Sequence, residues 1–262
     1  MITDRELQQF AEVGAVTIDT PLSQEQVEAA AAVFDRLLPF CEPKEVESPR
    51  FRLGATCSFY QAELLDIIQH PFFEDVAKRV LKADAVYFFQ TAMAITYPQP
   101  NTPFSFDQHV DIQYCLADLE AIPRRMVCSY FLWISDVNER RAPLMYRPGS
   151  HIRIAAERQE DPDLKDAVPQ VAGTSLNQLK DLQYTDPIPI VARAGQVSVL
   201  TTAMVHGASV NVDSLPRKVL VLTFTAKGVE IGLPANQAEA KQAYDRELRQ
   251  HLLPERKHIV PI

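Results

Sequence analysis

The chain has 262 residues, of which 47% are hydrophobic and 23% are charged, a composition typical of a globular protein with a sizeable core. Its formal net charge is −8, which argues against nucleic acid or an anionic membrane surface as the main partner. The chain begins with a polar, charged segment and has no apolar run near about 18 residues. We therefore expect a cytoplasmic protein without a membrane span.

The cysteines and glycines exclude two common kinds of site. The four cysteines are scattered without CxxC spacing, so we expect reduced thiols rather than a zinc cluster or a disulfide framework. Only eight glycines occur, and none forms the glycine-rich loop that cradles a nucleotide phosphate.

The first part of the chain is predicted to be mainly helical. Thr3 with Glu6 has the spacing of a helix-capping box, and Ser23 is expected to cap a second helix with Glu25, Gln26 and Glu28 in its first turns. Apolar residues with helical spacing follow each of these caps, and the same spacing recurs later in this part of the chain. The predicted helices cover residues 3–12, 23–38, 62–70 and 72–82. A short strand is expected at 13–18 and irregular chain at 40–58.

From residue 85 onward, β-branched and aromatic residues predict strands. The predicted strands cover residues 86–97, 126–134, 143–146, 188–191, 196–201 and 218–225. Short strands separated by turns of this kind favour a β-sandwich or barrel. Residues 157–185 are charged and have little strand character, which indicates a long insertion or lid.

A helix rich in alanine, glutamine and glutamate is expected at about 236–252. With no low-complexity linker in the chain, we predict one domain over 1–262. It has a helical part at about 1–83, a β core at about 84–226 and the C-terminal helix.

The segment His109-Val110-Asp111 has the pattern of half a metal site. Side chains two apart on an extended chain point to the same face. An imidazole and a carboxylate would then converge, as in the two-histidine, one-carboxylate site of non-haem Fe(II) oxygenases. His206, at the end of the apolar stretch 197–205, is the candidate third ligand. Asp107 would lie on the same face and competes with Asp111 for the carboxylate position.

Arg217 follows His206 by eleven residues. A turn through 211–216 would let the flanking strands pair, which would place Arg217 beside His206 across a ladder. A guanidinium matches a carboxylate with two hydrogen bonds. A metal with such a neighbour suits 2-oxoglutarate, which chelates with its keto-acid end and has a second carboxylate further on.

Three motifs make the chain resemble the phytanoyl-CoA dioxygenase family of Fe(II)/2-oxoglutarate-dependent oxygenases. They are His109-Val110-Asp111, the run from Ala142 through Pro148-Gly149-Ser150-His151, and His206-Gly207-Ala208-Ser209-Val210-Asn211 followed by Pro216-Arg217. The resemblance covers roughly residues 3–226. It implies a double-stranded β-helix (jelly-roll, cupin-like) core with helices packed on one sheet.

The resemblance also implies a chemistry. Iron would be bound by His109, Asp111 and His206, and Arg217 would hold the distal carboxylate of 2-oxoglutarate, with Gln90 and Ser209 as further contacts. O2 would decarboxylate 2-oxoglutarate to succinate and CO2, coupled to hydroxylation of an unactivated C–H bond of a small molecule. The carboxylate at Asp111 favours hydroxylation, desaturation or ring closure over halogenation, because related halogenases have a small residue there.

Other interpretations remain open. Gln113 and Tyr114, just after the ligand pair, are candidate substrate contacts. His151 is expected to shape its turn rather than to bind metal. The alternatives for the whole protein are a non-catalytic jelly-roll module that binds a small ligand, and a metal-dependent dioxygenase or isomerase that does not use 2-oxoglutarate.

Overall fold

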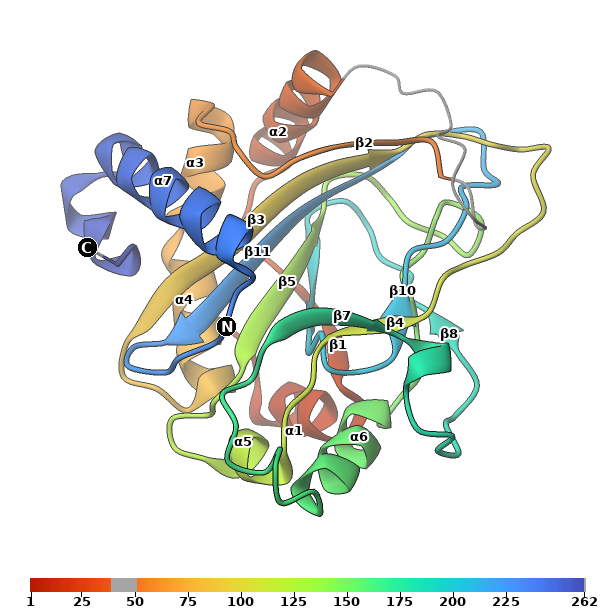
Figure 1. Cartoon of the computed structure of the whole chain (residues 1–262). Coiled ribbons are helices and arrows are strands. Elements are labelled where there is room, and N and C mark those ends of the chain that lie inside the picture. The colour runs from red at the N-terminus through yellow and green to blue at the C-terminus, as the bar shows by residue number, and fades with distance from the viewer. Residues whose placement is uncertain (39–50, 262) are drawn as a thin grey trace.

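The computed structural model describes residues 1–38 and 51–261, which form two β-sheets facing each other, with helices around them (Figure 1). All pairings between the named strands are antiparallel. This arrangement is the predicted jelly-roll core with flanking helices.

The larger sheet contains the long apolar strands and has six members. In spatial order they are β1 (Ala15–Asp19), β9 (Gln196–Leu200), β5 (Val127–Trp133), β11 (Arg217–Ala226), β3 (Val86–Thr96) and β2 (Leu53–Thr56). The longest strands, β3 and β11, are neighbours within this sheet.

The smaller sheet has five short strands. In spatial order they are β7 (Val171–Ser175), β4 (His109–Ile112), β10 (His206–Gly207), β6 (Met145–Tyr146) and β8 (Ile188–Pro189). The predicted histidine and aspartate motifs therefore lie on neighbouring strands of one sheet.

The helices begin at the predicted caps. The side chains of Thr3 and Ser23 each accept a hydrogen bond from the third residue of their helix, whose own side chain accepts from the backbone N–H of the cap. The α-helices are α1 (Asp4–Val13), α2 (Gln24–Leu37), α3 (Ala62–Ile68), α4 (Pro71–Leu81), α5 (Leu116–Glu120), α6 (Ser150–Gln159) and α7 (Ala235–His251). Short 3-10 helices occur at Leu176–Gln178 and Pro254–Ile259. No helix in the described ranges is long and apolar enough to cross a membrane.

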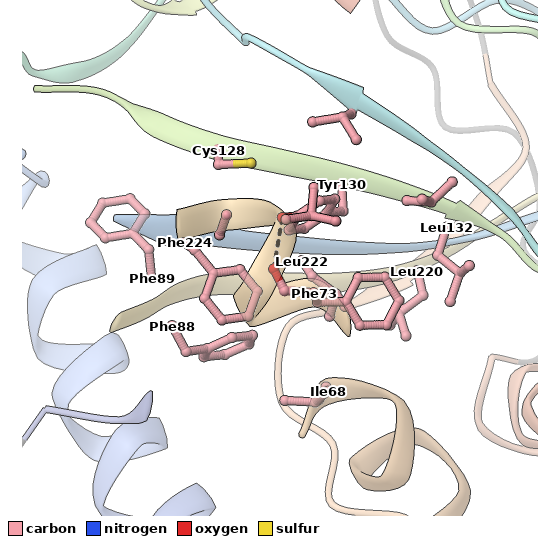
Figure 2. Packing of buried hydrophobic residues seen from close by; sticks show 14 of the residues in the cluster. Ile68, Phe73, Phe88, Phe89, Cys128, Tyr130, Leu132, Leu220, Leu222 and Phe224 are labelled. Carbon is pink, nitrogen blue, oxygen red and sulfur yellow. Dashed lines mark hydrogen bonds between the residues drawn. The ribbon is translucent and has the colours of Figure 1, made fainter. Parts of the chain in front are cut away.

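The main core lies between the larger sheet and α3 and α4 (Figure 2). The ring of Tyr130 lies edge-on to those of Phe73 and Phe224, at centroid distances of 5.4 and 5.9 Å. Its buried hydroxyl donates to the carbonyl oxygen of Phe73 at 2.8 Å. The ring centroid of Phe224 also lies 5.6 Å from that of Phe88. Removing one such buried ring typically costs about 3–5 kcal/mol. This face of the sheet therefore supplies stability, and the opposite face is free to carry the site.

Local structure differs from expectation in three places. Of the segment 40–58 that was expected to be irregular, residues 40–50 lie outside the described residues, and residues 53–56 form edge strand β2 by pairing with β3. The expected insertion at 157–185 contains β7, which pairs with β4. The segment after Gly149 continues as helix α6. Strands β2 and β7 have little apolar alternation, and they are strands because a longer or better anchored neighbour offers hydrogen-bonding groups.

Candidate active site

His109, Asp111 and His206 converge on one point, as the sequence predicts. Their ligand atoms lie within 4.8 Å of one another. Asp111 is central: its Oδ1 lies 3.3 Å from Nε2 of His109, and its Oδ2 lies 3.7 Å from Nε2 of His206. Both pairings follow from backbone geometry. Residues 109 and 111 share a face of β4, and His206 on β10 is the cross-strand partner of His109.

Hydrogen bonding prepares His206 for a metal. Nδ1 of His206 lies 2.9 Å from the carbonyl oxygen of Met204. Since a carbonyl only accepts, Nδ1 carries the proton and Nε2 keeps its lone pair toward Asp111. Burial lowers the pKa of His206, which keeps the imidazole neutral at neutral pH.

Asp111 is ionised at neutral pH. Burial raises the pKa of its carboxyl group, but the hydrogen bond with His109 and the electrostatic effects of the two histidines together outweigh burial and lower the pKa. The hydrogen bond with Asp111 raises the pKa of His109, against the effect of burial. Two imidazoles and one carboxylate are the donor set of a non-haem Fe(II) site, and metal binding would release the proton that His109 shares with Asp111. The residues therefore fit the metal.

Gly207 allows β4 and β10 to approach. A Cβ atom at Gly207 would overlap the carbonyl oxygen of Asp107. Any other residue would push the chain entering β4 away from β10, and with it His109. The glycine after His206 is therefore a requirement of the metal site.

The Gly149-Ser150-His151 turn holds the chain that leads into β10. The Ser150 hydroxyl accepts from the backbone N–H of Val205 at 2.8 Å and donates to the carbonyl of Arg147 at 2.7 Å. His151 is buried, and its Nε2 lies 3.1 Å from the carbonyl of Ala11. His151 thus shapes the structure and is not part of the metal cluster, as expected.

Arg217 is a buried cation. Only 4% of it is exposed, and its guanidinium lies 5.9 Å from the ring centroid of Trp133. Nη2 donates to the hydroxyl of Thr96 at 2.6 Å, while buried Nε has no partner. Burial lowers its pKa to about 10, so it remains charged at neutral pH. No carboxylate within residues 1–38 and 51–261 forms an ion pair with it.

The expected ladder between the strands of His206 and Arg217 was wrong. His206 is on β10 in the smaller sheet, whereas Arg217 begins β11 in the larger one. Arg217, Val219 and Val221 alternate along one face of β11. Val221 lines a cavity together with Asp111, so Arg217 projects from the face that looks toward the metal site.

Asp107 and Ser209 flank the cluster. Asp107 is exposed and lies outside the group of converging ligand atoms. Burial raises the pKa of its carboxyl group, against the effect of the charge on nearby His109. Ser209 is fully buried and donates to the carbonyl of Pro143 at 2.7 Å. Its proposed contact with 2-oxoglutarate remains a prediction.

Gln90 lies near the middle of β3, six residues from Thr96, the cross-strand partner of Arg217. It pairs with Thr223, whereas Arg217 pairs with Thr96. Six residues of extended strand span about 20 Å, more than a five-carbon diacid can bridge. Gln90 therefore does not share a carboxylate with Arg217. It lines a cavity of about 810 Å³ that also reaches Asp111.

Gln113 and Tyr114 do not line that cavity. Tyr114 is 1% exposed, and its hydroxyl accepts from the backbone N–H of Val127 at 3.1 Å, so its role is in the core. Gln113 donates to the hydroxyl of Thr174 on β7. No sequence pattern pointed to Thr96 as the partner of Arg217, or to α7 as a wall of the cavity, because tertiary packing alone determines both.

Solved structures share this fold. The epimerase SnoN, in complex with Fe3+, alpha ketoglutarate and nogalamycin RO, has a TM-score of 0.63 at 15% identity, covering 85% of this chain and 83% of its own. The alpha ketoglutarate dependent carbocyclase SnoK from nogalamycin biosynthesis has a TM-score of 0.62 at 21% identity, over 86% and 84%. HygX from Streptomyces hygroscopicus, with nickel, 2-oxoglutarate and hygromycin B bound, has a TM-score of 0.60 at 14% identity, over 87% and 88%.

No curated protein matches the sequence. The phytanoyl-CoA dioxygenase (PhyH) family does match, over residues 10–219, a range that contains the three motifs and every residue of the metal cluster. The chain therefore belongs to the phytanoyl-CoA dioxygenase family.

Proposed function

We propose that this protein is an Fe(II)/2-oxoglutarate-dependent oxygenase that acts on a small molecule, most simply by hydroxylating an unactivated C–H bond. His109, Asp111 and His206 would hold the iron, and 2-oxoglutarate and O2 would be co-substrates. Succinate and CO2 would be released. We also propose that residues 1–262 form one oxygenase domain.

The observation that carries the proposal is the charge at Arg217. A buried guanidinium is costly unless an anion accompanies it. Arg217 has Thr96 as a neutral partner and an unpaired Nε. A carboxylate supplied by a ligand would satisfy both the charge and the free donor. The metal cluster and this cation lie on facing sheets, as a ligand with a chelating end and a distal carboxylate requires.

Iron would supply the redox chemistry that activates O2 in the presence of 2-oxoglutarate. The chain's own residues do the rest. The Met204 carbonyl fixes the tautomer of His206, and Asp111 stays ionised between two imidazoles. Arg217 orients the co-substrate through its distal carboxylate. The apolar walls around Phe131 and Val221 exclude water from the reacting C–H bond.

Hydroxylation is the finer part of the proposal. The carboxylate of Asp111 occupies a ligand position, which disfavours halogenation. The fold also occurs in an epimerase and a carbocyclase that depend on alpha ketoglutarate. Epimerisation and ring closure are therefore the alternative outcomes of the same metal chemistry, and mass analysis of the product distinguishes them: hydroxylation adds one oxygen atom, ring closure removes two hydrogen atoms, and epimerisation leaves the mass unchanged.

The test is succinate formation. We expect succinate only when Fe(II), 2-oxoglutarate and O2 are all present, and none in the His109→Ala variant. Iron content after gel filtration gives a second readout, which should fall in this variant and not in Asp107→Asn. Full succinate formation by His109→Ala would contradict the proposal. Iron binding without any effect of 2-oxoglutarate would favour a metal enzyme that does not use this co-substrate.

A further inference from the structure

We propose that the cavity beneath α7 is the substrate pocket and that it takes an uncharged, mostly hydrocarbon molecule with one or two carbonyl or hydroxyl groups. This inference rests on the proposed function, because the pocket is defined by its opening to Asp111. A volume of about 810 Å³ is in the range that accepts a drug-sized ligand.

The cavity runs from the metal site to the C-terminal helix. Its floor is the inner face of the larger sheet, and Asp111 and Thr202 mark the metal end. The roof is the inward face of α7, and the chain after β2 forms an edge. The roof residues are Gln237, Ala240, Lys241, Ala243 and Tyr244.

The roof is held in place. The hydroxyl of Tyr244 donates to the carbonyl of Phe59 at 3.2 Å. The ring of Tyr60 stacks with those of Tyr244 and His251, at centroid distances of 5.3 and 5.0 Å. Leu248 of the same helix is fully buried. The pocket is therefore largely formed before a ligand arrives, which lowers the entropy cost of binding.

The charge of the lining defines the substrate class. Among the described residues, only Asp111 and Lys241 bring a formal charge to the wall. Asp111 belongs to the metal site. The ammonium group of Lys241 forms an ion pair with buried Asp245 and lies 5.9 Å from the ring centroid of Phe89. The described wall thus offers no unpaired cation to a phosphate or carboxylate, and burying such a group there would be costly.

Gln90 supplies a polar group to the apolar lining. Ser129 also has a hydroxyl without a hydrogen bond, but it is completely buried beneath the lining. The side-chain amide of Gln90 faces the cavity, while its backbone is fixed by Thr223, whose hydroxyl accepts from its N–H at 2.8 Å and donates to its C=O at 2.9 Å.

Gln90 faces inward by strand alternation with Ala92, which also lines the cavity, and a bulge brings its neighbour Phe89 to the same side. Thr223 pairs with Gln90 but Phe224 pairs with Phe88, so Phe89 is the extra residue on β3. Bulges turn side chains at functional sites. Here Phe89 and Gln90 both line the cavity. A carbonyl or hydroxyl on the substrate would meet Gln90, while the hydrocarbon body fills the remaining space. Gln90 is thereby assigned to substrate rather than to 2-oxoglutarate.

The first experiment measures occupancy of the cavity. Nile red, a neutral polycyclic dye, is titrated into the anaerobic Fe(II) protein with 2-oxoglutarate, and its fluorescence gives the dissociation constant. Ala240→Trp fills the roof from an exposed helix position, and Gln242→Trp adds the same side chain at an exposed position of α7 that does not line the cavity. We expect at least a tenfold weaker constant in Ala240→Trp and no change in Gln242→Trp. Equal constants in the two variants would overturn the proposal.

The second experiment tests charge. Bound Nile red is displaced by S-ethyl decanethioate, which is neutral, and by decanoyl-CoA, which has the same acyl chain and several phosphates. We expect the neutral thioester to displace the dye at least as well. Tenfold better displacement by decanoyl-CoA would overturn the proposal in favour of a coenzyme A thioester. If Gln90→Leu weakens dye binding by about five- to tenfold, the Gln90 amide contacts the ligand. If dye binding is unchanged, Gln90 does not contribute to the pocket.

Failure of the pocket and failure of the proposed function give different results. The absorption band that forms when 2-oxoglutarate chelates Fe(II) reports the function alone and should be the same in Ala240→Trp and wild type. If wild type gives this band but does not bind the dye, the pocket proposal fails and the proposed function stands. If wild type gives no band, the proposed function fails.

Discussion

The two sheets divide the work of the molecule unequally. The larger sheet contains β3 and β11, of 11 and 10 residues, and packs aromatic rings against α4. The smaller sheet has strands of two to five residues and carries all three candidate metal ligands. Stability is concentrated where burial is greatest, and chemistry is concentrated where the strands are short. Substitutions in the two sheets should therefore have separable effects.

The largest effect is expected at Asp111. Asp111→Asn replaces the carboxylate between the two imidazoles and should lower succinate formation at least about 100-fold. Its unfolding midpoint in urea should stay close to wild type, because Asp111 contributes chemistry rather than packing. Asp107→Asn is the matched control and should keep its activity. Equal losses in the two variants would show that Asp107 shares the metal site.

In the larger sheet the expected effect is on stability. Phe224→Ala removes a ring in contact with both Tyr130 and Phe88, and should lower the free energy of unfolding by about 3–5 kcal/mol. Tyr130→Phe keeps the ring and removes the donor to the Phe73 carbonyl, which should cost about 1–3 kcal/mol. Urea unfolding measures both. Iron affinity per folded molecule should be unchanged in both variants. A selective loss of iron in either variant would contradict the separation of stability and chemistry between the two sheets.

Glu74, on α4 behind the larger sheet, should make a pH-dependent contribution to the stability of the fold. It is 5% exposed and pairs with Lys78, Arg256 and His258. Burial opposes ionisation, but the hydrogen bonds from these three side chains and the charge of Arg256 lower its pKa from 4.5 to about 2. A lowered pKa stabilises the fold above about pH 4.5, and the effect is lost as the pH falls toward about 2.

Glu74→Gln should therefore lower the free energy of unfolding by about 2–3 kcal/mol at pH 7. Unfolding curves between pH 7 and pH 3 check this directly. The difference from wild type should shrink steadily below pH 4.5, and a difference independent of pH would contradict the ionic origin of the effect.

The smallest of these effects is expected at Gly207. Gly207→Ala places a Cβ against the Asp107 carbonyl and displaces β4 from β10. Iron affinity should fall about tenfold, a magnitude typical of changes that misorient metal ligands. Gly228→Ala also replaces a glycine and is the control for iron affinity: its φ of +84° strains an alanine and should lower stability, but nothing lies within 4 Å of the added Cβ. An unchanged iron affinity in Gly207→Ala would mean that the strands adjust without cost.

The sheets also differ in how far the sequence predicts them. Strands β3, β5 and β11 could be predicted because β-branched and aromatic residues recur along the full length of each strand. In the smaller sheet, composition predicted neither β7 nor the sheet to which β10 belongs. The ligands His109, Asp111 and His206 were found through motif spacing instead. The placement of Arg217 opposite Thr96, and of Gln90 in the cavity, depends on strand pairing across more than 120 residues, which no local pattern encodes.

The most direct test of the central claim is the visible absorption of the anaerobic Fe(II) protein during titration with 2-oxoglutarate. We predict a chelation band in wild type and in Asp107→Asn, and none in His206→Ala. In Arg217→Met the same band should require at least about tenfold more 2-oxoglutarate, because a charged hydrogen-bond partner is lost. A wild-type protein that binds Fe(II) but gives no band, or an Arg217→Met variant that titrates like wild type, would contradict the claim.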